Sequence, residues 1–383
     1  MPVPLPAPDA TDLRPPSAEE AQLTATGIAA LVRPPGGLTE LQRLLLIALF
    51  QSLTGHEVLI GGDEQREPRE VAEVLAARNL AFRTRCVQVS LLGALVLRPL
   101  PPDVVARVSA LASELGVDDQ MVPVARRFAE GSLGLAAIDF TRNGYTSTWS
   151  AADAKELHVS RVLDDAWETA VDDPVLAARW EGLGALPGGT LGRSVWELYR
   201  ARGFAFPGQP GSAPPLLAQH DWVHVLAGYG TTVECELEVF GFIARANDDP
   251  AGFSLLAMVV SLFETGYLRA GAGLFESDTG HLSRTGVVER LAEAMARGAR
   301  CRDVVTGSES IDFLRLDWFS VADLPLDDAR ARFSVTPVSA QARAAGSVGP
   351  WERGGISPFQ LESGQAAAER AGRPYDAHGA TPA

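Results

Sequence analysis

Apolar residues recur at helical spacing through two long stretches of this chain, and neither stretch shows the alternation of apolar and polar residues typical of half-buried strands. One side of the first predicted helix is marked by Leu41, Leu44, Leu45, Ala48 and Leu49. The same spacing resumes after a polar linker at 143–150 and continues to about residue 332. The spacing predicts a mainly α protein.

A chain of 383 residues is longer than one hydrophobic core usually organises, so we expect two helical domains. The spacing places them at 38–145 and 155–333. Residues 1–37 and 335–383 are rich in proline and small side chains. Because such segments bury too little apolar surface to offset the entropy lost on ordering, we expect disordered N- and C-terminal tails.

Charge and cysteine content exclude several classes of protein. The net charge of −15 argues against a nucleic acid or an anionic membrane attracted by bulk charge. The three separated cysteines, Cys86, Cys235 and Cys301, cannot form a disulfide framework or a thiolate zinc cage, which favours a reducing compartment. The N-terminus lacks the pattern of a signal peptide, and the longest apolar window, Phe253–Phe263, is too short to span a membrane. We expect a cytoplasmic protein with at most peripheral membrane contact.

Two histidines and an aspartate have the spacing of a helical metal site in the run His220-Asp221-Trp222-Val223-His224. A helix turns by about 100° per residue, so His220 and His224 lie about 40° apart and Asp221 falls within the same arc of about 100°. Histidines four residues apart can direct two ring nitrogens to one ion about 2 Å from each. The spacing predicts that the three side chains project together.

Glu236 lies on a second predicted helix, beyond a glycine-rich bend at 228–230. Residues 231–234, Thr-Thr-Val-Glu, have the form of a capping box that starts this helix. Apolar residues share the face of Glu236, whereas Glu234, Glu238 and Arg245 fall on the opposite side. The pattern therefore directs one glutamate of the three toward the core.

A metal ion is the simplest way to accommodate that buried carboxylate. A lone buried charge is strongly destabilising unless it is neutralised, paired or bound to a cation, and no lysine or arginine shares the face. The preceding helix offers two histidines and an aspartate. We therefore predict a divalent ion, with zinc as the first choice and iron, cobalt and manganese left open by the donor set.

Each part of this site has an alternative without a metal. Histidines four residues apart often serve only packing, and Glu236 can instead accept hydrogen bonds from Tyr229 or a helix end. Cys235, a possible extra ligand, lies about 100° away from the Glu236 direction, so we interpret it as a small core residue. The remaining histidines share no spacing and are left unassigned: His56, His158, His281 and His378.

The pattern H-D-x-x-H-x11-E resembles the hallmark of the Coq-four family of ubiquinone (coenzyme Q) biosynthesis. Other features of that family occur in the same order, namely Leu-Pro-Gly-Gly-Thr-Leu-Gly-Arg at 186–193, the run at 220–228, Thr231-Thr232, Asp317-Trp318-Phe319, Leu324-Pro325-Leu326 and Arg330. The resemblance covers roughly 155–333. It implies that the metal ligands are His220, Asp221, His224 and Glu236.

The resemblance also implies an activity. It suggests a metal-dependent lyase that removes the ring carboxylate of a prenylated aromatic acid, with hydroxylation at the same carbon, and other quinone-biosynthesis proteins as partners. The helix at 253–263 is a candidate wall for the prenyl tail, although plain core is the commoner role of such a helix. A second interpretation is a non-catalytic, prenyl-lipid-binding scaffold with a structural metal. A third interpretation is an HD-type phosphohydrolase, which needs further ligands such as His158 and Asp248 or Asp249. A fourth, an H-E-x-x-H protease, is disfavoured because Asp221 replaces the glutamate base.

Several features depart from the family. Cys235 and Tyr229-Gly230 replace a small residue and an apolar-proline pair, and the first helical domain is an addition. Arginine supplies every basic side chain except Lys155 and the histidines, which is typical of GC-rich bacterial coding and leaves open a different quinone precursor. The helices of the first domain, with an acidic turn at Gly62-Asp63-Glu64, are similar to the TerB-like tellurite-resistance fold; the alternative is a generic helical bundle.

Overall fold

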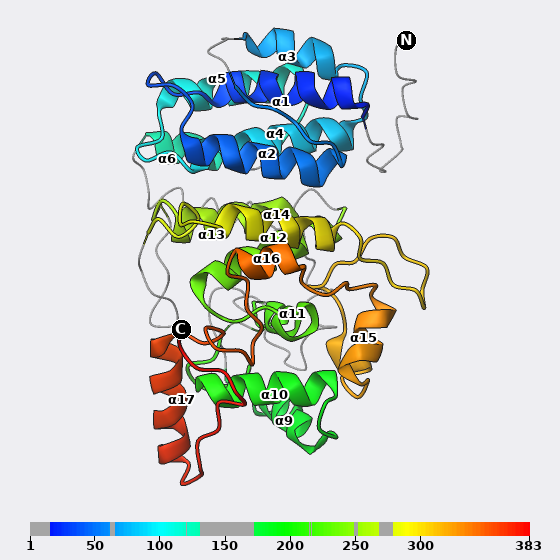
Figure 1. Cartoon of the computed structure of the whole chain (residues 1–383), viewed down its shortest axis with the longest axis vertical. Coiled ribbons are helices and arrows are strands. Elements are labelled where there is room, and N and C mark those ends of the chain that lie inside the picture. Colours follow the sequence, from blue (N-terminus) through cyan, green and yellow to red (C-terminus); the bar gives the residue numbers. More distant parts are fainter. Residues whose placement is uncertain are drawn as a thin grey trace. The chain divides into compact units, whose positions relative to one another are not determined.

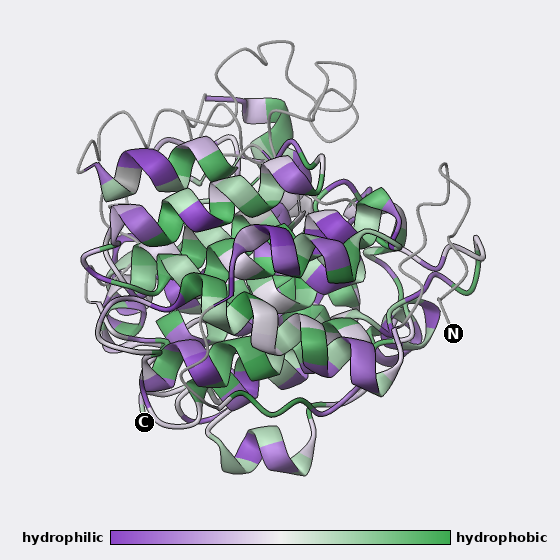
Figure 2. Ribbon diagram, turned by 90° about the horizontal axis from the view of Figure 1, so that it is seen from above, coloured by the Kyte–Doolittle hydropathy of each residue, from purple (hydrophilic) through white to green (hydrophobic). Residues whose placement is uncertain are grey.

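Helices account for almost all of the regular structure in a computed structural model of the chain (Figure 1). The structure describes residues 16–61, 66–119, 121–130, 172–213, 215, 217–248, 252–267 and 279–383. Within these ranges the only β-type pairings are isolated bridges, such as the one between Thr190 and Pro325. The helices carry both apolar and polar residues along their ribbons, as amphipathic helices do (Figure 2). The predicted mainly α class is confirmed.

The chain divides into two compact units, each assembled from two separate stretches of sequence. The first unit comprises 1–147 and 248–295, and the second comprises 148–247 and 296–383. The sequence instead predicts continuous domains at 38–145 and 155–333. The division differs because the helix at 252–263 joins the first unit, and spacing alone does not show which of two cores receives an apolar helix.

The first unit is a helical bundle. Its helices are α1 (Ala18–Val32), α2 (Glu40–Thr54), α3 (Pro68–Leu75), α4 (Leu80–Leu95), α5 (Pro102–Glu114), α6 (Met121–Ala129) and α13 (Gly252–Phe263), and it includes most of α14 (Val287–Gly298). Helix α1 packs against α2 to α5, and α13 packs against α4. Asn79 caps α4, and Thr39 with Gln42 forms a capping box on α2. The acidic turn at 62–64 lies outside the described residues, so the TerB-like resemblance stays a prediction.

The second unit is built around an aromatic core. Its helices are α9 (Pro174–Gly182), η2 (Leu183–Ala185), α10 (Leu191–Arg202), α11 (Gln219–Ala227), α12 (Val233–Ala246), η3 (Trp318–Val321), α15 (Leu326–Arg332), α16 (Ala340–Ala344) and α17 (Pro358–Arg370). Trp222 of α11 stacks on Trp318 with ring centroids 5.6 Å apart, and Trp180 lies against Trp222 at the same distance. These large rings exclude water from one side of α11.

Two distant segments hold α11 and α10 in place. The backbone N–H groups of Leu191 and Gly192 donate to the carbonyls of Leu324 and Ala322. Arg330 of α15 donates from Nε to the carbonyl of Leu226, at the end of α11, at 2.9 Å. A cation at a helix C-terminus satisfies carbonyls that lack partners within the helix.

The predicted disordered tails are wrong wherever the structure describes them. Residues 18–32 form α1, which buries Ile28, Leu31 and Val32. Residues 335–383 contain α16 and α17, and α17 packs along α10. Its buried positions include Gly364, where an added Cβ would lie 2.1 Å from the carbonyl oxygen of Ala201. We predicted disorder because small residues give these segments a low apolar content. Small residues also permit close backbone packing, which the prediction did not consider.

No helix among the described residues combines the length and the apolar character needed to cross a membrane.

Candidate metal centre

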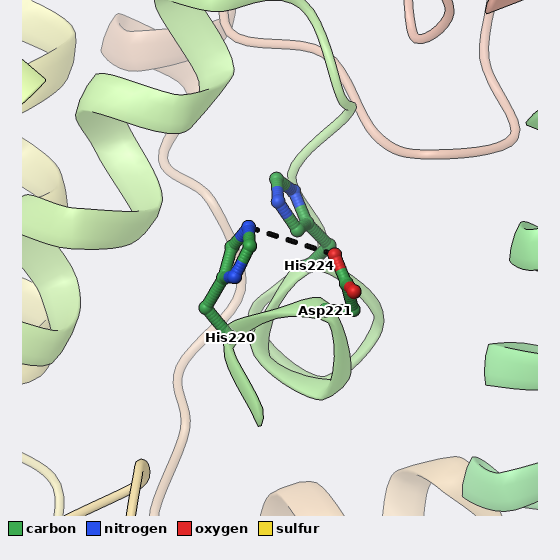
Figure 3. Close-up of side chains that lie close together, drawn as sticks. All are labelled: His220, Asp221 and His224. Atoms are coloured by element: carbon green, nitrogen blue, oxygen red, sulfur yellow. Dashed lines mark ion pairs between the residues drawn. The ribbon is translucent and has the colours of Figure 1, made fainter. Parts of the chain in front are cut away.

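Helix α11 presents three potential ligands on one buried side. His220, Asp221 and His224 are at most 7% exposed, and one potential ligand atom from each lies within 4.8 Å of the others. Figure 3 shows the two imidazole rings and the carboxylate converging beside the helix, with the ion pair of His220 and Asp221 dashed. The predicted convergence of these residues is confirmed, and the structure contains a buried His/Asp cluster that can hold a metal ion.

The bend after α11 brings the fourth residue to the cluster. Gly228 ends α11 in the left-handed conformation, with φ of 78°, which glycine adopts without steric cost. Thr232 then caps α12 with extended backbone, but its hydroxyl donates to Cys235 Sγ at 3.2 Å and accepts no hydrogen bond from the helix backbone. The predicted capping box is therefore wrong. The helix still begins where expected, and Glu236 lies in its first turn.

Glu236 lies between the two imidazoles. Its Oε2 is 3.3 Å from Nε2 of His220, and its Oε1 is 3.3 Å from Nε2 of His224. Asp221 Oδ1 is 3.5 Å from Nε2 of His220. Charge-assisted N–H···O hydrogen bonds are about 2.7–2.9 Å long. By contrast, a tetrahedral ion with bonds of about 2.0–2.1 Å holds its ligand atoms about 3.3–3.4 Å apart, so the two histidine–glutamate separations are compatible with ligands of one ion.

Backbone carbonyls and a tyrosine orient the ligands. Nδ1 of His220 donates to the carbonyl of Leu217, and Nδ1 of His224 donates to the carbonyl of Gly230 at 2.6 Å. A carbonyl oxygen only accepts, so in a neutral ring each Nε2 is left with its lone pair directed at the cluster. The hydroxyl of Tyr199, from α10, donates to Asp221 Oδ2 at 2.5 Å. This leaves Oδ1 of Asp221 available to the cluster.

Two buried ligand atoms lack hydrogen bonds among the described residues. They are Nε2 of His224 and Oε2 of Glu236. Leaving a buried polar atom unsatisfied is destabilising by about 1–3 kcal/mol. Two imidazole nitrogens and carboxylate oxygens are donors that divalent transition metals accept. The orphaned atoms and the donor set therefore both fit a bound divalent ion.

The charges of the cluster favour a cation at its centre. Burial by itself lowers the pKa of His220, but the carboxylates of Asp221 and Glu236 outweigh it and raise that pKa to about 9. Burial raises the pKa of Glu236, but His224 and His220 outweigh it and hold the pKa well below its usual value. Burial and the charge of Asp221 raise the pKa of Tyr199 far above its ordinary value, so its hydroxyl keeps the donated proton.

Two charged residues near the site are buried, which the sequence did not predict. Glu238, which we placed on the side of α12 away from the core, is fully buried. Arg202, at the end of α10, is also fully buried, and the charges of Asp221 and Glu236 act on its pKa. Its hydrogen bonds go to Thr231 and backbone carbonyls, so it does not pair with either carboxylate. A helix face reveals only the residues on that helix, which is why Arg202 escaped the prediction.

The other candidate residues do not join the cluster. Cys235 is buried, as predicted for a small core residue. His56 and His378 take other partners, Pro16 and Glu197. The structure places Asp248, one of two candidate aspartate ligands in the phosphohydrolase interpretation, exposed at the start of a segment of the first unit. His158 and Asp249 lie outside the described residues, so that ligand set stays a prediction.

Comparison of the chain with protein-family models, with curated proteins and with solved structures finds no match. The likeness to the Coq-four family therefore stays a resemblance carried by the motif and its neighbouring segments.

Proposed function

We propose that this protein holds a divalent metal ion through His220, Asp221, His224 and Glu236 and removes the carboxylate of a prenylated aromatic acid in quinone biosynthesis. One observation carries the metal site: both buried Nε2 atoms lie 3.3 Å from Glu236 oxygens, while both Nδ1 atoms already donate to carbonyls. Zinc suits such a set at tetrahedral spacing, and iron, cobalt and manganese accept the same donors.

The segments that carry the family resemblance support the proposal because they contact one another or α11. Residues 191–192 pair with 322–324, and Arg330 binds the C-terminal carbonyls of α11. Trp318, from the Asp-Trp-Phe segment, stacks on Trp222. A motif matched by chance has no reason to gather the other matched segments around itself.

The residues of the site have distinct tasks in the proposed lyase. When bound, the ion supplies Lewis-acid stabilisation of the negative charge that develops as the bond between ring and carboxylate breaks. Asp221 and Glu236 hold the ion and offset its charge, and Tyr199 keeps Asp221 in one orientation. The aromatic side chains around α11 exclude water, which strengthens these electrostatic interactions. The family resemblance implies a prenylated aromatic or lipid ligand as the partner.

A non-catalytic scaffold is the second candidate, and the closure of the site favours it. Structural zinc sites use four protein ligands, whereas catalytic sites keep one position open for water or substrate. Two histidines and two carboxylates fill four positions, and all four residues are at most 7% exposed. In this version the ion stabilises a prenyl-lipid-binding protein of the quinone pathway and takes no part in a reaction.

Metal analysis tests the site before any substrate is chosen. We expect elemental analysis of the purified protein to find about one divalent ion per chain, and His220→Ala to lose it. His56→Ala is the matched control, because His56 binds the carbonyl of Pro16 and no residue of the cluster. Equal metal content in the wild type and His220→Ala would refute the site.

A turnover assay separates the two candidate functions. We expect the metal-loaded protein to release carbon dioxide from a prenylated benzoate labelled at the carboxyl carbon, and Glu236→Gln to abolish that release. If instead the wild type releases no carbon dioxide while Glu236→Gln lowers the melting temperature, the ion is structural and the scaffold is the better assignment.

A further inference from the structure

The segment between α16 and α17 lies against the bend that joins α11 to α12. The N–H of Gly230 donates to the carbonyl of Val348 at 2.8 Å, and the N–H of Thr231 donates to the carbonyl of Gly355 at 3.0 Å. An added Cβ on Gly230 would lie 2.8 Å from Cα of Gly355. Backbone therefore meets backbone here, within the second unit and beyond the stretch that resembles the Coq-four family.

Arg202 also binds this segment. Its Nε donates to Thr231 Oγ1 at 2.5 Å, and its Nη2 donates to the carbonyls of Pro350 and Gly355 at 2.8 and 2.9 Å. Burial lowers the pKa of Arg202 to about 10, so the guanidinium stays charged at neutral pH. Hydrogen bonds from a buried charged donor are among the stronger ones in proteins.

Gln360, at the start of α17, completes the contact through both ends of its amide. Its Oε1 accepts from Thr231 Oγ1 at 2.7 Å, and its Nε2 donates to the carbonyl of Thr231 at 2.7 Å. Thr231 is thus held by Arg202 and Gln360 together. Such a buried network has little freedom to shift, because each displaced group would lose its partner without gaining water.

This network ends at a ligand of the candidate metal centre. Gly230, whose N–H is held by Val348, accepts through its carbonyl the Nδ1 proton of His224. That hydrogen bond sets the rotation of the imidazole and the direction of Nε2. A displacement of Gly230 therefore turns the ring away from Glu236.

We propose that residues 347–360 help to position a ligand of the metal centre. They act with Arg202 and Thr231 to fix the Gly230 carbonyl that orients His224. The inference rests on the proposed metal site. It makes Arg202, Thr231 and Gln360 positioning residues, since none of them is a ligand. It also gives the C-terminal segment a specific role, where the sequence predicted only disorder.

Substitution of Gln360, followed by metal titration, tests this inference. We expect Gln360→Ala to weaken zinc binding about 10- to 100-fold, measured by competition with a chromophoric chelator in the full-length protein. We also expect it to change the visible absorption of bound Co²⁺, which depends on ligand geometry. A control lies on the same helix, because Gln365→Ala alters an exposed glutamine. It should keep the wild-type affinity and spectrum.

Thr231 offers a second test that does not depend on the folding of Gln360→Ala. Thr231→Ser keeps the hydroxyl and should bind as the wild type does, whereas Thr231→Val removes it and should weaken binding. The inference is overturned if Gln360→Ala and Thr231→Val match their controls in affinity and Co²⁺ spectrum. A wild-type protein that binds neither ion would instead refute the proposed function, and the inference with it.

Discussion

At the scale of single residues, the uncharged hydroxyl of Tyr199 fixes the orientation of the Asp221 carboxylate. It donates to Asp221 Oδ2 at 2.5 Å and is buried with it. We expect Tyr199→Phe to weaken zinc binding about 10- to 100-fold, because Asp221 loses the donor that orients it. Chelator competition measures the loss. Tyr375→Phe also removes one hydroxyl, the donor to Ala201, and equal weakening in both variants would contradict the role given to Tyr199.

Asp312 provides a pH-dependent test of stability away from the site. Burial raises its pKa to about 6 from the ordinary value of 3.8, although the N–H of Leu314 and the charge of Arg315 act in the opposite direction. The folded protein therefore binds the Asp312 proton more tightly than the unfolded chain. This group's stabilising contribution is complete below about pH 4 and is lost as the pH rises to about 6.

We expect Asp312→Asn, which keeps a carbonyl acceptor for Leu314, to raise the free energy of unfolding at pH 7 by about 1–3 kcal/mol. The gain should vanish at pH 4, where the wild-type carboxyl is protonated. Urea unfolding midpoints at the two pH values measure it. Asp323→Asn changes an exposed carboxyl and should leave the midpoint unchanged at both. A gain that persists at pH 4 would show that charge is not its cause.

The residue types and spacing predicted that His220, Asp221 and His224 cluster, but not the residues that hold them. The spacing places His220, Asp221 and His224 on one face of a helix and Glu236 on the inner face of the next. The structure brings the first three together and places Glu236 beside both histidines. Tyr199 and Arg202 act from another helix, and their sequence positions carry no signal of that contact. Glu238 is buried by neighbours outside its own helix, which periodicity does not represent.

At the scale of elements, the bend between α11 and α12 depends on how closely Gly230 approaches Gly355. An added methyl group on Gly230 would lie 2.8 Å from both Cα and the carbonyl oxygen of Gly355, and backbone atoms cannot move aside as a flexible side chain does. We expect Gly230→Ala to lower the melting temperature of the metal-free protein and to weaken zinc binding, because the carbonyl that accepts from His224 is displaced.

Gly182→Ala is the matched control for that substitution. Gly182 ends α9, and an added methyl group there meets no heavy atom within 4 Å. Alanine in such a position is neutral or stabilising by up to about 1 kcal/mol. If Gly230→Ala behaves as Gly182→Ala does in both melting and zinc titration, the close approach has no bearing on the site.

Element positions followed from the sequence where apolar residues mark one helix face, and were missed where small residues do the packing. The helix predicted at 253–263 begins one residue after α13 begins and ends where α13 ends. Helix α17 has few large apolar residues, and its buried side consists of Gln360, Gly364 and Ala368. That composition is the same as in a disordered tail, and only the contact with α10 distinguishes the two.

At the scale of the whole molecule, every residue of the candidate metal centre and of the network around it belongs to the second unit. The ligands come from 220–236, and their supports come from 199–202 and 348–360. The first unit contributes none of these described contacts. A ligand stabilises the parts of a protein that must unfold to release it, so metal binding should distinguish the two units.

Hydrogen exchange with and without zinc tests this division. At a free zinc concentration 100 times Kd, binding adds about 2.7 kcal/mol to the stability of the bound state, which slows exchange about 100-fold where amides exchange through unfolding of that unit. We expect this protection in α11, α12 and residues 347–370, and unchanged exchange in α1 to α5. His220→Ala with zinc should show no protection anywhere. Protection confined to α11 and α12 would show that the C-terminal segment opens independently of the ion, and equal protection in α1 to α5 would show that the two units unfold as one.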